Sequence, residues 1–188
     1  MSIQVRPATP DRWTDLITVF GRRGDDLSWC WCRRFLDESR PTGDNREALR
    51  QEMKHAAVPP GLIAYVDEQP VGWTRVGPRS DFPGVGGNRA LARVLTDDPG
   101  TWWVTCFVVD SPHRRSGVGL ALLEAAIVFA REHGASAVEG HPVDVVALRA
   151  TRVSGSAVFT GTLAMFSAAG FTEVARTYPT RPLMRRVV

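Results

Sequence analysis

A bulky apolar run followed by a glycine-containing turn and an apolar helical stripe constrains this 188-residue chain more than any other feature. Residues 102–109 read Trp-Trp-Val-Thr-Cys-Phe-Val-Val, which predicts a buried strand because aromatic and β-branched side chains favour strands. After a turn at 114–119, residues 120–130 repeat apolar side chains at helical spacing. Residues 137–141 predict a second strand, so the helix is expected to make a right-handed crossover between two parallel strands.

The rest of the chain adds strands and helices around this unit. Alternation and short apolar runs predict strands at residues 3–6, 62–66, 71–76, 171–177 and 183–187. Helices are predicted at 9–20, at 44–57 and at 162–169, with Thr9 and Asp44 as N-caps of the first two. Residues 77–100 are rich in Gly, Pro and Asp and predict a long loop with one helical turn near 91–95. We expect a single domain, residues 1–188, with a mixed α/β fold in which helices flank a central β-sheet.

The turn at 114–119, Arg-Arg-Ser-Gly-Val-Gly, has the chemistry of an anion site. The first turn of a helix presents unpaired N–H groups and the positive end of the helix dipole. Gly117 and Gly119 let an anion approach the backbone, and Arg114 and Arg115 add guanidinium groups suited to phosphate. A pyrophosphate is the expected guest, although glycines that serve packing alone would give the same pattern.

Two other phosphate-binding folds fit these residues less well. A dinucleotide-binding fold requires G-x-G-x-x-G, and Leu122 stands where the third glycine would be. A P-loop requires G-x-x-x-x-G-K-[ST], which the sequence lacks. A nucleotide-binding α/β protein stays open as the weakest alternative.

The turn resembles a known family motif. Residues 114–119 fit [Q/R]-x-x-G-x-[G/A], the motif of the GNAT superfamily of N-acetyltransferases, and residues 163–171, Leu-Ala-Met-Phe-Ser-Ala-Ala-Gly-Phe, resemble that family's closing helix and Gly-Phe junction. The resemblance implies the GNAT fold, acyltransferase activity and acetyl-CoA as co-substrate. It also implies that the strand before the motif binds pantetheine and that the motif backbone binds pyrophosphate. The cofactor-binding residues implied are Phe107, Val108, Val109, Arg114, Arg115, Ser116, Gly117, Val118, Gly119 and Leu120.

The residues for proton transfer depart from the family pattern. Many GNAT proteins have Asn at the position of Phe159 and, at the position of Phe166, the Tyr that protonates the leaving thiolate. Thr160, Thr162 or Ser167 could replace that hydroxyl, although each fits a cap or a surface group as well. The strand at 102–109 has no carboxylate to act as base. Glu139 is therefore the first candidate for base or water relay and His141 the second, with a surface carboxylate and a hydrogen-bonded structural histidine as the alternatives.

An aromatic cluster at Trp29 and Trp31, interleaved with Cys30 and Cys32, lies where the GNAT fold places a segment over the acceptor site. The two tryptophans are expected to form a wall for the acceptor, or else to pack on the core. The odd number of cysteines argues against a disulfide framework. The cysteines and histidines show no metal-ligand spacing, so no metal site is expected.

Charge and hydropathy limit the partners. The net charge is +3 and the basic residues are scattered, which argues against a nucleic-acid surface. No apolar run approaches the roughly 20 residues that span a bilayer, and the N-terminus lacks a secretory pattern, so a cytoplasmic protein without membrane contact is expected. An exposed pair of C-terminal strands could support a homodimer.

Two functions follow from these features. The first is transfer of an acetyl group from acetyl-CoA to a primary amine, on a small-molecule or peptide acceptor, by direct attack in a ternary complex. The second is a non-catalytic CoA-binding or regulatory module that keeps the fold, because Phe166 and the carboxylate-free strand leave proton transfer unassigned.

Overall fold

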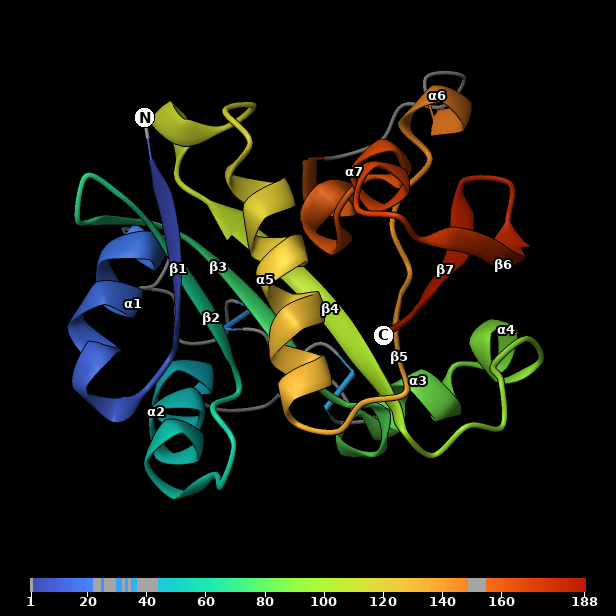
Figure 1. The fold of residues 1–188 in the computed structure, drawn as a ribbon, viewed down its shortest axis with the longest axis horizontal. Helices are drawn as coiled ribbons and strands as arrows, with labels where there is room; N and C mark the ends of the chain where they lie inside the picture. The colour runs from blue at the N-terminus through green and yellow to red at the C-terminus, as the bar shows by residue number, and fades with distance from the viewer. Residues whose placement is uncertain are drawn as a thin grey trace.

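The computed structural model describes residues 2–21, 25, 30, 31, 33, 35, 36, 44–148 and 155–188, with the side chains of 155–157 excepted. Its centre is a seven-stranded sheet in the order β1-β2-β3-β4-β5-β7-β6 (Figure 1). The strands are β1 (Ile3–Pro7), β2 (Gly61–Val66), β3 (Gln69–Pro78), β4 (Thr101–Val109), β5 (Ala137–Gly140), β6 (Thr172–Tyr178) and β7 (Arg181–Val187). Only β4 and β5 pair in parallel, and each other neighbouring pair in this order is antiparallel. The predicted mixed sheet is confirmed.

Helices cover both faces of the sheet. The longer ones are α1 (Trp13–Phe20), α2 (Asn45–His55), α5 (Val118–Glu132) and α7 (Leu163–Ala168), and the short ones are α3 (Pro83–Gly87), α4 (Arg89–Ala92) and α6 (Val145–Leu148). Helix α5 connects β4 to β5 and lies across the sheet in Figure 1. It packs on Leu62 and Ala64, while Ile63 and Tyr65 face the cluster that contains α1 and α2. The alternation along β2 thus divides the core between the two faces.

Two helix N-termini test the N-caps that the sequence predicts. Asp44 Oδ1 accepts a hydrogen bond from the Glu47 N–H at 3.0 Å, as expected of an N-cap. Thr9 is the N-cap residue of a 3-10 helix at Pro10–Arg12, as predicted, but its hydroxyl makes no capping hydrogen bond and instead accepts from Arg12 Nη1 at 2.5 Å. A side-chain donor has replaced the backbone donor there.

The segment at 77–100 is more ordered than its composition predicts. It contains a 3-10 helix at Arg79–Asp81 as well as α3 and α4. The prediction of a loop with one turn is therefore wrong. The short helices hold because Phe82, Val85 and Leu91 are buried in one cluster with Trp103 and Leu183. Tertiary burial has outweighed a Gly- and Pro-rich composition.

Strand β4 is irregular where the site begins. Arg75 pairs with Cys106 and Val76 with Val104, so Thr105 is the extra residue of a β-bulge. The pairing of β4 with β5 ends at Val104 and Gly140, whereas β4 continues to Val109. Residues 105–109 of β4 therefore have a free side toward the chain that follows β5, and we call them the free part of β4.

Beyond β5 the chain turns to a different partner. Val143 forms an isolated parallel bridge with Thr162, its N–H donates to the Gly161 carbonyl at 3.0 Å, and its carbonyl accepts from the Leu163 N–H at 2.8 Å. The segment before α7 is held in this way opposite the free part of β4.

The cysteines differ from expectation. Cys106 is disulfide-bonded, and Cys30 is free. The sequence argued against a disulfide framework, and an odd count of cysteines does not prevent the single bond at Cys106, because proximity in the fold decides cysteine pairing.

Candidate active site

A cleft of about 990 Å³ opens between the free part of β4, the start of α5 and the segment that enters α7. Its lining residues are Phe107, Val108, Val109, His113, Arg114, Arg115, Gly117, Gly119, Leu120, Val158, Phe159, Gly161, Thr162, Ala164 and Met165. The lining is apolar along β4 and α7 and basic at the turn. A ligand with an apolar arm and an anionic head would match this distribution.

The turn at 114–119 is built to leave backbone N–H groups available. Arg115 has φ 63° and Gly117 has φ 90°, so two left-handed residues bend the chain sharply into α5. Gly117 is the N-cap of the helix and has no side chain to accept from the first N–H groups. Gly119 and Leu120, in the first turn of α5, line the cleft together with Gly117. The positive end of a 15-residue helix therefore faces the cleft.

Hydrogen bonds fix this turn to the end of β4. Arg114 Nε donates to the Val109 carbonyl at 3.1 Å, and Ser116 Oγ donates to the His113 carbonyl at 2.6 Å. His113 Nδ1 lies 2.8 Å from Asp110 Oδ1, which orients the imidazole at the wall of the cleft. The turn is thus positioned before any ligand arrives, which reduces the entropic cost of binding.

Eight of the ten residues predicted to bind the cofactor line the cleft. The exceptions are Ser116, whose hydroxyl is engaged by the His113 carbonyl, and Val118, whose side chain is in the core. A methyl group added at Gly72 would lie 2.8 Å from Val118 Cγ1, so Val118 seats α5 against β3. Both residues belong to the turn, and their side chains serve its packing.

The opposite wall was missed by sequence reasoning as a binding surface. It comprises Val158, Phe159, Gly161, Thr162, Ala164 and Met165, and His113 was missed beside the turn. Gly161 has φ 80°, and a Cβ there would lie 2.6 Å from Met165 Cε and 3.1 Å from Phe107 Cε2. This glycine lets the segment approach β4. A glycine directly before the Thr162 cap was the signal available in the sequence.

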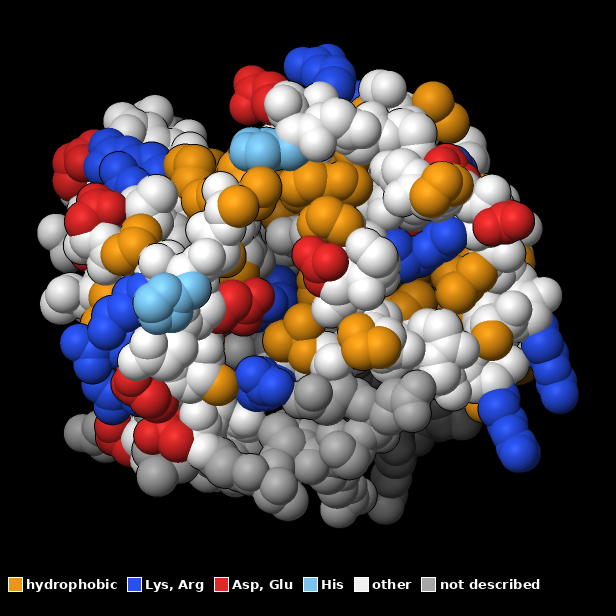
Figure 2. Space-filling model, turned by 90° about the horizontal axis from the view of Figure 1, so that it is seen from below, with side chains coloured by type: hydrophobic (Ala, Val, Ile, Leu, Met, Phe, Trp, Pro, Cys, Tyr) orange, Lys and Arg blue, Asp and Glu red, His pale blue; other side chains and the backbone are white. Residues whose placement is uncertain are grey.

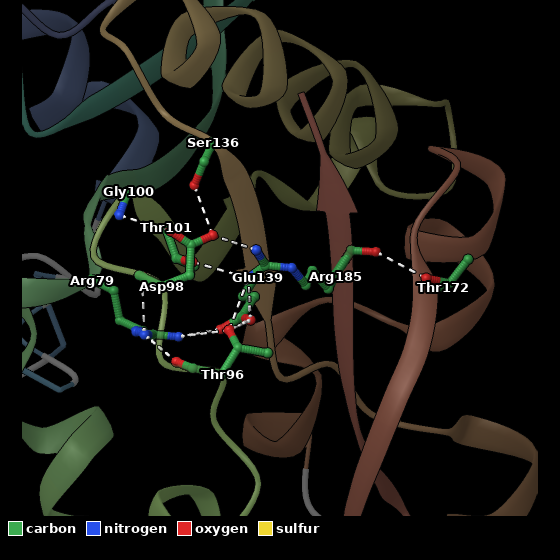
Figure 3. Close-up of polar contacts among 9 residues, drawn as sticks. All are labelled: Arg79, Thr96, Asp98, Gly100, Thr101, Ser136, Glu139, Thr172 and Arg185. Atoms are coloured by element: carbon green, nitrogen blue, oxygen red, sulfur yellow. Dashed lines mark hydrogen bonds and ion pairs between the residues drawn. The ribbon is translucent and has the colours of Figure 1, made fainter.

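Glu139, the first candidate for the base, lies in a buried ion network (Figure 3). Its side chain is fully buried, Oε2 accepts from Arg79 Nη1 at 2.9 Å, and Oε1 accepts from Arg185 Nη1 at 2.8 Å. Thr96 Oγ1 donates to Oε1 at 3.0 Å. Glu139 does not line the cleft. Both carboxylate oxygens of Glu139 are thus engaged by guanidinium groups outside the cleft lining, which favours a structural role over that of the predicted base.

The same network extends to the loop before β4. Arg185 Nη2 contacts Asp98 Oδ2 at 2.5 Å, and Ser136 Oγ donates to the same oxygen at 2.8 Å. The hydrogen bonds from Arg185 and Ser136 lower the pKa of Asp98 to about 2. The network joins β5, β7 and the segment that leads into β4, as Figure 3 shows.

His141 and Trp31 are also absent from the cleft lining. His141 Nε2 is 2.8 Å from Thr177 Oγ1, and the side chain is nearly buried. Trp31 is buried and stacks on Phe20, with ring centroids 4.1 Å apart, which matches core packing and contradicts an open wall for the acceptor. Trp29 lies outside the described residues.

The three hydroxyls that could replace the family's Tyr differ in where they lie. Phe166 is fully buried, edge-on to Phe107 and Phe171, and does not line the cleft. Thr160 Oγ1 accepts from Arg181 Nη1 at 2.8 Å. Of the three candidate hydroxyls, Thr162 alone lines the cleft, where its oxygen also accepts from the Met165 N–H as the α7 cap.

The described residues contain no group of three or more His, Cys, Asp or Glu side chains placed to hold a metal ion. Within the same residues, no helix is long and apolar enough to cross a bilayer. On the face shown in Figure 2, Lys and Arg side chains are interspersed with Asp and Glu.

Comparisons with known proteins agree with this geometry. A model of the acetyltransferase (GNAT) family matches residues 25–152, which is more than half of the chain. No curated protein sequence matches the chain significantly.

Solved structures share the fold along almost the whole chain. A ribosomal-protein-alanine N-acetyltransferase from Brucella melitensis is 19% identical, with a TM-score of 0.55 over 98% of this chain and 99% of that one. The GNAT domain of S. lividans PAT is 17% identical, with a TM-score of 0.58 over 99% and 90% of the two chains. The putative acetyltransferase yncA from Salmonella typhimurium, solved with acetyl-CoA, is 15% identical, with a TM-score of 0.56 over 100% and 94%. These likenesses show the fold, and the family match shows that the chain belongs to the GNAT family of N-acetyltransferases, whose members use acetyl-CoA.

Proposed function

We propose that this protein transfers the acetyl group of acetyl-CoA to a primary amine by direct attack in a ternary complex. The observation that carries the proposal is the N-terminus of α5, which Gly117 opens onto a cleft of about 990 Å³ along the free part of β4. One element supplies N–H donors for a pyrophosphate, and the other supplies an extended backbone for an amide-containing arm.

The residues along the cleft would contact the parts of acetyl-CoA in the order pyrophosphate, pantetheine and acetyl group. The first N–H groups of α5 would hold the pyrophosphate, with the side chains of Arg114 and Arg115 beside it. The backbone of Val108 and Val109 would pair with the pantetheine amides, since this part of β4 has no partner in β5. The acetyl end would then reach Phe107, next to the bulge.

The chemistry of this site requires little from side chains. The amine nitrogen attacks the thioester carbonyl, the C–S bond breaks, and the amine proton goes to water. A thiol has a pKa of about 8.5, so CoA thiolate can leave without a strong acid. Backbone N–H groups of β4 near the bulge would stabilise the developing oxyanion. Thr162 is the cleft hydroxyl closest in sequence to the position where many family members have Tyr.

The test is titration of the purified protein with acetyl-CoA in a calorimeter, followed by a free-thiol assay over a panel of amines. Binding of acetyl-CoA together with thiol release that depends on one class of amine supports the proposal. Absence of acetyl-CoA binding would overturn it.

A non-catalytic CoA-binding module is the second candidate. It is favoured by Phe166 in place of a hydroxyl donor and by the Glu139 carboxylate being held in its ion network. Binding of acetyl-CoA without thiol release for any amine would support this second function.

A further inference from the structure

Buried hydrogen-bond donors without partners gather where β3 and β4 meet at the bulge. They are Arg75 Nε, Arg75 Nη1, Trp103 Nε1 and Thr105 Oγ1, and none has a partner among the described residues. All three side chains are almost completely buried. A fifth buried donor atom, Trp31 Nε1, lies in the cluster beside α1 and α2. Natural proteins rarely leave such groups unsatisfied, because each loses its hydrogen bonds to water.

The register places the three side chains together. Arg75 is opposite Cys106, Trp103 is opposite Gly77, and Thr105 is the extra residue between these two pairs. The Arg75 guanidinium lies 5.7 Å from the centre of the Phe82 ring, and Phe82 is in the same cluster as Trp103. Phe82, the residue before α3, thus lies beside Arg75 and belongs to the same buried cluster as Trp103.

This group of donors lies near Phe107 along β4, but on the other face of the sheet and outside the cleft lining. Phe107 is in the cluster that contains α5, whereas Cys106, the register partner of Arg75, is in the cluster that contains α1 and α2. Phe107 lines the cleft and follows Thr105 by two residues, which is about 7 Å along a strand. Because β4 has no partner in β5 after Val104, the sheet is open beside Phe107, and an acceptor that enters from the face of Arg75 would reach the thioester through this opening.

The donors define the chemistry of a ligand. Guanidinium and indole N–H groups donate and cannot accept, so the ligand must offer acceptor oxygens. Arg75 Nη2 is already paired with Glu52 of α2, and Asp81 is near enough to act on the same guanidinium. These two carboxylates disfavour a dianion such as phosphate. A planar carboxylate, with one charge and two oxygens, fits the remaining Nε and Nη1 donors.

We infer that the acceptor amine also bears a carboxylate, which Arg75, Trp103 and Thr105 bind next to the bulge. This rests on the proposed acetyl transfer, since it names the class of acceptor for the same site. Burial lowers the pKa of Arg75, and a bound carboxylate would stabilise the charged guanidinium.

The experiment compares free amino acids with their carboxamides, in which the charge is removed and the amine is kept. Calorimetry first measures acetyl-CoA binding, and the free-thiol assay then gives kcat/KM for each pair at a pH where both amines are equally deprotonated. We expect kcat/KM for the best amino acid to exceed that for its carboxamide by about tenfold or more, as for hydrogen bonds to a charged group.

Two nearly isosteric variants remove single donors. W103F and T105V should each lower the ratio of amino acid to carboxamide by about three- to tenfold, through KM, with the Kd for acetyl-CoA unchanged. R75Q should lower the ratio of kcat/KM for the amino acid to that for its carboxamide to about one. W102F is the matched control, because Trp102 lies on the same strand in the cluster that faces α5, and it should leave the ratio unchanged.

Equal kcat/KM for amino acids and carboxamides, or a ratio that W103F and T105V leave unchanged, would overturn this inference alone. Either result would mean that the donors of Arg75, Trp103 and Thr105 bind buried water and no acceptor. Failure of acetyl-CoA to bind would overturn the proposed function and the inference with it.

Discussion

Arg114 donates from its Nε to the carbonyl oxygen of Val109 at 3.1 Å, so the first residue of the turn is fixed to the last residue of β4. This bond joins the end of the cleft that we propose for the pyrophosphate to the strand that would hold the pantetheine arm. A single guanidinium can therefore set the spacing between the two and still present its remaining N–H groups to a phosphate.

Replacement of Arg114 by Gln should weaken acetyl-CoA binding by about tenfold and leave kcat nearly unchanged, because a charge-assisted contact at the phosphates is lost and the reacting end is not touched. Calorimetry and the dependence of the rate on acetyl-CoA measure the two effects. R131Q, at the exposed C-terminal end of α5, is the control for a lost surface charge. An unchanged Kd in R114Q would show that Arg114 only packs the turn.

Gly117→Ala should cost about 1–2 kcal/mol of stability, because φ 90° is a left-handed conformation that a Cβ disfavours. It should also weaken acetyl-CoA binding, since relief of that strain would turn the first N–H groups of α5 away from the cleft. Gly134→Ala is a close match, with φ 82° at the other end of α5 and open space around the added methyl group.

Thermal unfolding and calorimetry on both glycine variants separate the effects. Both should unfold at lower temperature, and only G117A should bind acetyl-CoA more weakly. Equal affinities in the two variants would remove the α5 N-terminus from the binding site.

Glu139→Gln should destabilise the protein by about 3–5 kcal/mol, because Arg79 and Arg185 would lose their shared buried counter-charge. The folded fraction should keep its kcat, measured at a temperature well below the unfolding transition. A large fall in kcat at unchanged stability would instead restore Glu139 as the base.

The contribution of the Asp98 carboxylate to stability should be visible in the pH dependence of unfolding. Its pKa is lowered to about 2 by Arg185 and Ser136, below its ordinary value of 3.8, so the ionised form is favoured by folding. Its contribution is complete above about pH 4 and is lost as the pH falls through about 2. Denaturation curves for D98N should therefore be flatter than those of the natural chain between pH 4 and pH 2. Parallel curves would show that Asp98 gains nothing from its partners.

The sequence could predict the part of the site that depends on neighbours along the chain. The strand, turn and helix around residues 102–130 were predictable because their periodicity and glycines act locally. The helices α3 and α4 were not, since burial of Phe82 and Leu91 against distant strands decides them. The role of Glu139 was hidden for the same reason. Its arginine partners are 60 and 46 residues away, and no pattern in the sequence joins them.

The rate of transfer should follow the protonation state of the acceptor. Glu139 is held by arginines and His141 by Thr177, and His113 lies beside the turn, away from the acetyl end, so none of these described side chains is placed to take the amine proton. We expect log kcat/KM to rise with pH until the acceptor's own pKa, and the bend to move when amines of different pKa are compared.

A bend near pH 6.5 that stays fixed for all amines would instead indicate a histidine base. H141Q and H113Q would then identify which histidine it is. Because the acceptor's pKa and a protein pKa move independently, this comparison decides whether the protein supplies a base or only selects the neutral amine.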